Sequence, residues 1–321
     1  MFQFAIIGCG RIGRHHALAL DADGRGRAAA LFDVDREAAE RLQRDCVPQA
    51  EIHSDLESLL DEAAVDAVII CSPTSAHFDH VMACWERGLP ILCEKPLADT
   101  RERIVELIEK AARGAPPLAV AYQRRYSSIY RTLRRELQAD RWGPIRAVTA
   151  QLVEDWQSTI GETWRDDPAH NLGGFVGDAG SHKIDVVFYV TGRKPVEVFA
   201  QCDCCGSRVE IATAVCGRLE GRVSLGMNFL GHAHHLGEDF HITCDEADLL
   251  VRDERLWIAR NNRVEPFPET EMEPDSTPVS GFIDLLEEGR PNPAPPDCAL
   301  PVFDFTQAIL ESSRTNRLVR L

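Results

Sequence analysis

The amino-terminal stretch reads FQFAIIGCGRIG over residues 2–13, and it decides the fold expected for the first half of the chain. Residues 2–7 form an apolar run too short for a helix, glycines follow at 8, 10 and 13, and residues 17–20 continue with helical spacing. Strand, glycine turn and helix in this order predict a dinucleotide-binding fingerprint. Gly8 permits the tight turn, Gly10 lets the backbone approach a pyrophosphate, and Gly13 lets the helix pack closely on the strand.

An acidic residue follows the fingerprint at the expected distance. A second apolar run over residues 28–32 ends at Asp33, 20 residues after Gly13. A carboxylate at this point accepts hydrogen bonds from the adenosine ribose hydroxyls and repels a 2′-phosphate. We therefore expect NAD as cofactor, although Asp35 and Arg36 leave room for NADP. The alternative is a glycine turn in a sheet protein that binds no nucleotide.

From Asp33 onward, helical and strand-like segments alternate, as in a doubly wound parallel sheet. The expected helices cover residues 36–44, 55–62, 77–87 and 100–113, and the expected strands cover 65–71, 90–93 and 118–122. Strand 65–71 leads into Ser72-Pro73-Thr74, and strand 90–93 leads into Glu94-Lys95-Pro96. Ligands bind at the carboxyl ends of parallel strands, so Lys95 is expected on the ligand side.

The pattern changes after about residue 123. A helix over 127–138 is followed by expected strands at 145–153, 197–201, 209–218, 222–229, 240–243 and 248–252. Such a succession predicts a mostly antiparallel sheet with helices on one face. The acidic, proline-rich segment 264–278 predicts a loop, and residues 297–314 return to helical spacing.

Composition limits the class of protein. The chain has 321 residues, of which 44% are hydrophobic, enough for two packed cores. A net charge of −16 argues against a nucleic acid or an anionic membrane as partner. The sequence has no apolar stretch long enough to span a bilayer, and the first strand begins at once without a signal peptide. We therefore expect a cytoplasmic protein.

The cysteines and histidines raise the question of a metal. Eleven cysteines are present, and apolar surroundings such as those of Cys71 and Cys93 predict reduced core thiols. One cluster consists of Cys202, Cys204 and Cys205. It lacks a second pair at zinc-ribbon spacing, so no metal is expected. A second cluster consists of His232, His234 and His235. This segment is expected to be either a loop lining a pocket or a solvated turn.

A further group of polar residues lies in the second half. On one helix, Asp178, His182 and Asp185 would be separated by four and three residues and would share a face. Asp178 could then orient the His182 imidazole, which can accept a hydroxyl proton near neutral pH. The alternative is that Asp178 caps the helix and His182 is a structural residue.

The chain as a whole resembles the glucose-fructose oxidoreductase and inositol dehydrogenase family, Gfo/Idh/MocA. The resemblance rests on the glycine fingerprint with His16, Asp33, the 72–77 turn, Glu94-Lys95-Pro96, Arg125, Trp164-Arg165, and Gly173-Gly174 with Asp178 and His182. The order and spacing of these motifs are specific together, and residues 308–321 resemble the closing helix and strand of the family.

The resemblance implies an α/β plus α+β protein of two domains. Residues 1–122 would form an NAD-binding Rossmann domain. Residues 123–321 would form a substrate-binding domain with a large open sheet, whose face commonly mediates homodimers or homotetramers. The closing segment of the chain can pack back on the first domain.

The resemblance also implies roles for individual residues. Lys95 matches the catalytic lysine, Asp178 and His182 match the acid/base pair, and Pro96 matches a proline often preceded by a cis peptide bond. The expected cofactor-binding residues are Gly8, Gly10, Arg11, Ile12, Gly13, Asp33, Ser72, Pro73, Thr74, His77, Glu94 and Lys95. The expected substrate-binding residues are Lys95, Arg125, Trp164, Arg165, Asp178, His182 and His235.

The expected reaction is reversible oxidation of a secondary alcohol on a sugar, inositol or related polyol. His182 would take the hydroxyl proton while hydride passes to the nicotinamide, and Lys95 would hydrogen-bond the reacting oxygen. Two alternatives use the same fold. One is an NAD-dependent glycosidase or sugar-sugar oxidoreductase, and the other is a non-catalytic NAD-binding sensor.

Overall fold

The chain divides into two compact units in the computed structural model, which describes residues 1–321. The first unit consists of Met1–Tyr126 and Ser276–Leu300, and the second of Ser127–Asp275 and Pro301–Leu321. The expected domain boundary after residue 122 lies at residue 126, and residues 276–300 cluster with the first unit. The reason is helix α10 (Pro278–Glu288), which was not expected from the sequence. Its Phe282 packs against Phe4, with ring centroids 6.4 Å apart.

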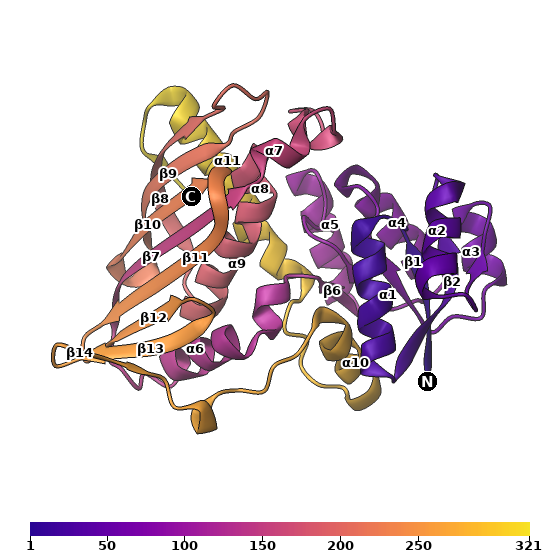
Figure 1. The fold of residues 1–321 in the computed structure, drawn as a ribbon, viewed down its shortest axis with the longest axis horizontal. Helices are drawn as coiled ribbons and strands as arrows, with labels where there is room; N and C mark the ends of the chain where they lie inside the picture. The colour runs from indigo at the N-terminus through magenta and orange to yellow at the C-terminus, as the bar shows by residue number, and fades with distance from the viewer. The chain divides into compact units, whose positions relative to one another are not determined.

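A six-stranded parallel sheet forms the centre of the first unit (Figure 1). Its strands are β1 (Phe2–Ile7), β2 (Gly26–Phe32), β3 (Glu51–Ile52), β4 (Ala67–Ile70), β5 (Ile91–Cys93) and β6 (Leu118–Val120). Their order is β3-β2-β1-β4-β5-β6, so the order of strands reverses between β1 and β4. This is the doubly wound topology expected from the sequence, and its ligands bind where the order reverses.

Helices cover the sheet of the first unit. They are α1 (Arg11–Asp23), α2 (Arg36–Cys46), α3 (Leu56–Glu62), α4 (Thr74–Glu86) and α5 (Arg101–Ala112), with short turns η1 (Gln123–Tyr126) and η5 (Pro296–Cys298). Side chains of α1, α2 and α10 share one buried cluster with β1, β2 and β4. Helix α4 begins at Thr74, three residues before the expected start at His77. Pro73, with a φ of −60°, leads directly into it.

A nine-stranded sheet forms the second unit. Its strands are β7 (Ile145–Asp155), β8 (Pro195–Asp203), β9 (Ala212–Leu219), β10 (Val223–Leu230), β11 (His232–Cys244), β12 (Asp248–Arg252), β13 (Arg255–Arg260), β14 (Arg263–Pro266) and β15 (Val319–Arg320). Their order is β14-β13-β12-β11-β7-β10-β9-β8-β15. Only β7 and β10 pair in parallel, which confirms the mostly antiparallel sheet.

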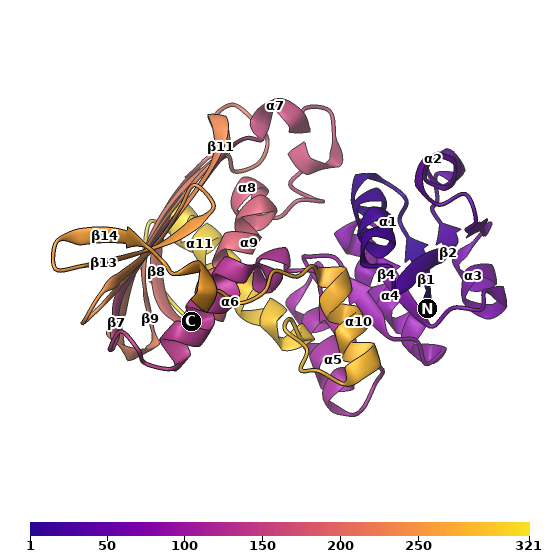
Figure 2. The same cartoon turned by 60° about the horizontal axis from the view of Figure 1, so that its bottom comes forward.

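The longer helices of the second unit lie on one face of this sheet, as expected (Figure 2). They are α6 (Ser128–Gln138), α9 (Ala179–Thr191) and α11 (Ala299–Thr315). The short helical segments are α7 (Gln157–Ile160), η2 (Trp164–Asp166), α8 (Gly174–Gly177), η3 (Glu220–Arg222) and η4 (Glu269–Glu271). In the middle of β7, Val148, Ala150 and Leu152 are buried, while Thr149 between the first two is exposed.

One expectation about loops was wrong in part, and another was wrong. Residues 263–266 form edge strand β14, where Pro266 pairs with Trp257, whereas residues 267–277 form the expected loop apart from the short turn η4. Proline is tolerated on an edge strand because it needs no donor there. The His232–His235 segment is neither a loop nor a turn, because β11 begins at His232 and extends to Cys244. Its pairing with β7 is irregular between His232 and Gly237.

All eleven cysteines are free thiols, in agreement with the expectation that they are reduced. Five of them are buried, namely Cys9, Cys84, Cys93, Cys244 and Cys298. Residues 1–321 contain no group of three or more His, Cys, Asp or Glu side chains arranged to hold a metal ion. None of the helices combines the length and the apolar character needed to cross a membrane.

Candidate active site

The turn after β1 requires glycine at two positions. Gly8 has a φ of 95°, and a Cβ there would lie 2.5 Å from the carbonyl carbon of Cys71, just after β4. A Cβ on Gly13 would lie 2.1 Å from the carbonyl oxygen of Gly8. Any larger residue would therefore push α1 away from β1 or β1 away from β4. The two glycines bring the amino end of α1 to the point where the strand order reverses.

The amino end of α1 is open to an anion. Gly10 precedes the helix, no side chain caps it, and a Cβ built on Gly10 meets no atom within 4 Å. The first N–H groups of a helix lack partners within the helix, and the helix dipole favours negative charge there. This space fits a pyrophosphate, with the backbone of Arg11, Ile12 and Gly13 as the donors.

Asp33 is held in a fixed orientation at the end of β2. Its Oδ2 accepts a hydrogen bond of 2.6 Å from the backbone N–H of Cys9, and its Oδ1 accepts one of 2.9 Å from the N–H of Asp35. The carboxylate is half-buried. It therefore stands next to the glycine turn, where a ribose of a bound dinucleotide would lie.

Two arginines close to Asp33 along the chain are paired with carboxylates. Arg36 lies 3.0 Å from Glu40, and Arg41 lies 3.2 Å from Asp35. Such exposed pairs contribute only about 0–1 kcal/mol each. A 2′-phosphate would nevertheless have to displace them and overcome the charge of Asp33. This arrangement favours NAD over NADP.

The segments that follow β4 and β5 are joined by His77 of α4. Its Nε2 lies 2.8 Å from the carbonyl oxygen of Ser72, and its Nδ1 lies 2.8 Å from the carbonyl oxygen of Pro96. The hydroxyl of Ser72 also contacts Nδ1 of His80, at 2.9 Å. The peptide bond between Lys95 and Pro96 is cis, as the family resemblance implied. Ser72, Lys95 and Pro96 are all half-buried at this edge of the sheet.

Glu94 is a charged group inside the first unit. Its Oε1 lies 2.8 Å from Nε2 of His16, which is 2% exposed. Burial by itself raises the pKa of Glu94, but the hydrogen bond with His16 and the charges of His16 and Lys95 outweigh it and lower the pKa overall. Glu94 is therefore a carboxylate at neutral pH, directly before Lys95.

Asp178 lies between two helices rather than within one. It follows α8 and occupies the N-cap position of α9, with φ −87° and ψ −87°, as the alternative from the sequence had it, so only His182 and Asp185 lie within the same helix. The segment before it requires glycine, because a Cβ on Gly174, the first residue of α8, would lie 2.2 Å from the carbonyl oxygen of Glu210. His182 and Asp178 are half-buried, while Asp185 is fully buried in the core of the unit.

Arg165 is a partner of Asp178 that sequence analysis did not foresee. Its Nε donates a hydrogen bond of 3.0 Å to Asp178 Oδ2, and its guanidinium lies 4.4 Å from the centre of the Trp164 ring. The carbonyl oxygen of Arg165 accepts a 2.7 Å bond from Asn171. The second unit thus brings Trp164, Arg165 and Asp178 together, with His182 one turn further along α9.

The remaining expected substrate residues are placed differently. Arg125 in η1 is buried, and its guanidinium donates a 2.9 Å hydrogen bond to the carbonyl oxygen of Pro293. His235 on β11 is exposed and lies beside Gly237. Arg125 therefore has a structural partner within the first unit, whereas the imidazole of His235 is accessible to solvent.

Two contacts of the first unit could not be predicted from the sequence. Glu94 meets His16, which is 78 residues away in the chain, and Ser72 meets His80. The presence of His16 after the glycine fingerprint was noticed, but no spacing rule joins residues that only sheet formation brings together.

Family models match both halves of the chain. Residues 2–122 match an "Oxidoreductase family, NAD-binding Rossmann fold" and residues 130–250 match a "GFO/IDH/MocA C-terminal domain". Inositol 2-dehydrogenase 2 of Saccharopolyspora erythraea is 32% identical over 200 residues, which are 62% of this chain and 56% of the relative. Inositol 2-dehydrogenase of Paracoccus denitrificans is 35% identical over 189 residues, 58% of this chain and 53% of the relative. The chain spans about half the length of these curated relatives.

Solved structures share the fold over the whole chain. An oxidoreductase domain protein from Kribbella flavida superposes with a TM-score of 0.88 at 20% identity, covering 100% of this chain and 99% of that one. The scyllo-inositol dehydrogenase of Lactobacillus casei, solved with NAD(H) and scyllo-inositol, has a TM-score of 0.84 at 17% identity and covers 100% and 99%. At these identities the likeness concerns the fold.

Proposed function

Because this chain belongs to the GFO/IDH/MocA oxidoreductase family and begins with its NAD-binding Rossmann domain, we propose that it is an NAD-dependent dehydrogenase of a secondary alcohol. The proposed substrate is a sugar, an inositol or a related polyol, in keeping with the inositol 2-dehydrogenases among its relatives. The observation that carries the proposal is Lys95, which directly follows the ionised Glu94 at the edge of the sheet where a dinucleotide fits.

The proposed mechanism divides the work between binding and proton transfer. The backbone at Arg11, Ile12 and Gly13 would hold the pyrophosphate, and Asp33 would bind a ribose. Bound NAD supplies the hydride acceptor. Lys95 donates a hydrogen bond to the reacting hydroxyl oxygen and stabilises its alkoxide character. His182 accepts the hydroxyl proton, which balances the hydride that leaves the same carbon.

Asp178 has a supporting role in this proposal. Its carboxylate is already held by the Arg165 guanidinium at 3.0 Å, which fixes its position and partly neutralises its charge. A carboxylate fixed in this way is better suited to orienting His182 or to accepting a bond from a neighbouring substrate hydroxyl than to taking the proton itself. Trp164 and Arg165 would then bound the substrate on the same side.

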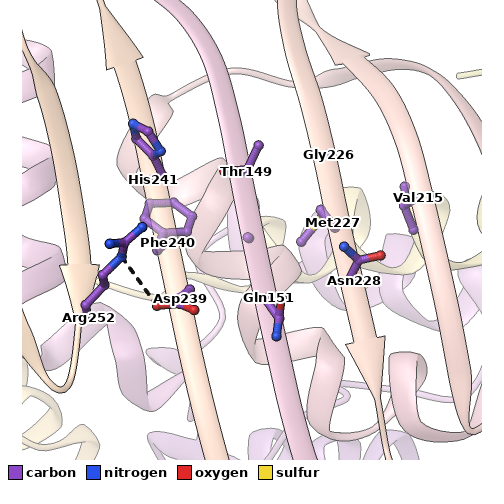
Figure 3. A pocket seen from close by; sticks show the side chains of 11 residues that line it. Thr149, Gln151, Val215, Gly226, Met227, Asn228, Asp239, Phe240, His241 and Arg252 are labelled. Atoms are coloured by element: carbon purple, nitrogen blue, oxygen red, sulfur yellow. Dashed lines mark ion pairs between the residues drawn. The ribbon is translucent and has the colours of Figure 1, made fainter.

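The open face of the nine-stranded sheet is the proposed surface for a homodimer or homotetramer. Its centre carries short and polar side chains, including Thr149, Gln151 and Asn228 (Figure 3). Gly226 lies beside Thr149 and adds no side chain. Arg252 and Asp239, 3.8 Å apart, border the shallow hollow of about 230 Å³ that these residues line. A face whose centre carries mostly short side chains can approach another sheet closely.

The test is reduction of NAD across a panel of inositols, aldoses and sugar acids, with wild type, Lys95→Met and Lys110→Met compared. We expect wild type to turn over at least one polyol, and Lys95→Met to lower kcat by about 10²–10⁴-fold while NAD affinity changes little. Lys110, a partly exposed lysine on α5 that lies 3.9 Å from Glu106, is the matched control, and Lys110→Met should behave as wild type. NAD binding without turnover of any polyol would favour a sensor, and equal loss of turnover and NAD affinity in Lys95→Met would remove Lys95 from its role.

A further inference from the structure

His77 lies at the junction of two segments of the first unit, those that follow β4 and β5. Its side chain is 1% exposed, and each ring nitrogen lies 2.8 Å from a backbone carbonyl oxygen, of Ser72 on one side and of Pro96 on the other. Both nitrogens are therefore occupied by the protein. His77 has no ring nitrogen left for the cofactor, although it was expected to bind it.

We propose that His77 is a positioning residue, which fixes the Lys95–Pro96 segment through a hydrogen bond from its Nδ1–H to the carbonyl oxygen of Pro96. The inference rests on the proposed function insofar as Lys95 is the group that it positions. The bond itself is a property of the fold and does not depend on any substrate.

The chemistry of the ring requires a choice between its two contacts. A neutral imidazole carries one N–H and one lone pair, so it donates to only one of two carbonyl oxygens. Burial lowers the pKa of His77, and this outweighs the two carbonyl oxygens and the charge of Glu94, which raise it. The charge of Lys95 lowers it further, and His80 is the other titratable neighbour. The ring is therefore neutral near pH 7.

We assign the single ring N–H of His77 to the hydrogen bond with the carbonyl oxygen of Pro96 rather than with that of Ser72. Ser72 is anchored independently, because its hydroxyl contacts His80 at 2.9 Å and the preceding Cys71 donates a 2.7 Å backbone bond to Ile7. Pro96 has no N–H of its own, so its carbonyl is the polar group through which its backbone can be held. A hydrogen bond at this carbonyl restrains the residue next to Lys95.

Two substitutions separate the two nitrogens. Asparagine places an amide nitrogen near the Nδ1 position, and glutamine places one near Nε2. We expect His77→Asn to keep kcat within about tenfold of wild type and His77→Gln to lower kcat by about 100-fold, with NAD affinity changed less than kcat in both. Hydrogen–deuterium exchange of peptides covering residues 94–98 should be faster in His77→Gln than in His77→Asn. Equal effects of the two substitutions, or the reverse order, would overturn the proposal.

The buried His53 beyond β3 supplies the control pair, His53→Asn and His53→Gln, which should not differ in kcat or in exchange at 94–98. If neither His77 variant folds, the proposal can still be tested on the wild-type protein by determining which ring nitrogen of His77 carries the proton. The ¹⁵N shifts of selectively labelled histidine must show His77 protonated at Nδ1 near pH 7, and a ring protonated at Nε2 contradicts the proposal. Hydrogen–deuterium exchange at residues 94–98 and the tautomer of His77 are both measured without substrate. Failure of the dehydrogenase assay would therefore contradict the proposed function alone, and these two measurements would still test the role of His77.

Discussion

Glu94 shows how a single contact decides the charge of a buried residue. Burial alone would raise the pKa of its carboxyl group and favour the neutral acid. The hydrogen bond with His16 at 2.8 Å reverses this, and the net effect is a lowered pKa. The carboxylate thus stabilises the fold above the ordinary glutamate pKa of about 4.3, and this contribution is lost as the pH falls through the lowered value.

Replacing His16 should therefore make stability depend on pH in a defined way. In His16→Ala, burial acts on Glu94 with less opposition, so the charged form becomes costly to the folded state. We expect a loss of about 1–3 kcal/mol in the free energy of unfolding near pH 7 and a smaller loss near about pH 4, where Glu94 of the variant can bind a proton and no longer has to be buried as a charge. Urea unfolding at both pH values measures this. His15→Ala, at the exposed neighbouring position, should change little, and a loss independent of pH in His16→Ala would contradict the argument.

In the strand–turn–helix element at the amino terminus, one glycine is needed for packing and another for ligand binding. Gly13 is in contact with the backbone of Gly8, while Gly10 faces open space. Two glycines three residues apart therefore serve different purposes. One is needed for the fold, and the other leaves room for a ligand at the helix end.

Alanine substitutions test this division. Gly13→Ala should lower the free energy of unfolding by about 1–3 kcal/mol or more, because its Cβ would lie 2.1 Å from a backbone oxygen that cannot move alone. Gly10→Ala should leave stability within about 1 kcal/mol, since it meets no atom within 4 Å, and should weaken NAD binding by at least about tenfold. Chemical denaturation and NADH fluorescence titration give the two readouts. If Gly10→Ala bound NAD as tightly as wild type, the proposed pyrophosphate site at the amino end of α1 would be wrong.

The elements differ in how well their sequences predicted them. Strand β12 was predicted to the residue, because its apolar run is bounded by turn residues. Strand β14 was missed, since its sequence is charged and proline-containing and its pairing partner β13 provides the structure. The break at Asp178 was missed because the sequence periodicity continues through it, whereas the backbone at Asp178 leaves the helical conformation between α8 and α9.

At the scale of the whole molecule, the open sheet face is the surface on which self-association can be tested. Thr149, Gln151 and Asn228 are central on this face, and a long cation among them would separate two opposed sheets. The chain mass of 35.7 kDa is the reference for a monomer.

Asn228→Arg should shift the assembly toward the monomer mass, as measured by light scattering after size-exclusion chromatography. Its free energy of unfolding per chain should fall if the assembly stabilises the fold. Gln49→Arg adds the same charge at an exposed loop position of the first unit and should leave the assembly unchanged. A wild-type protein that is already monomeric, or an unaltered mass in Asn228→Arg, would refute association through this face.

Sequence by itself predicted the Rossmann fingerprint and the mostly antiparallel sheet, because periodicity and glycine placement are local signals, and the family resemblance named Lys95, Asp178 and His182 as candidates. Only the tertiary structure decided which core residues 276–300 join, since an amphipathic helix can pack on any apolar face of suitable shape. It also decided the partners of the polar groups, namely His16 with Glu94 and Arg165 with Asp178. Hydrogen bonds between distant segments depend on how strands and helices pack, and no spacing along the chain encodes them.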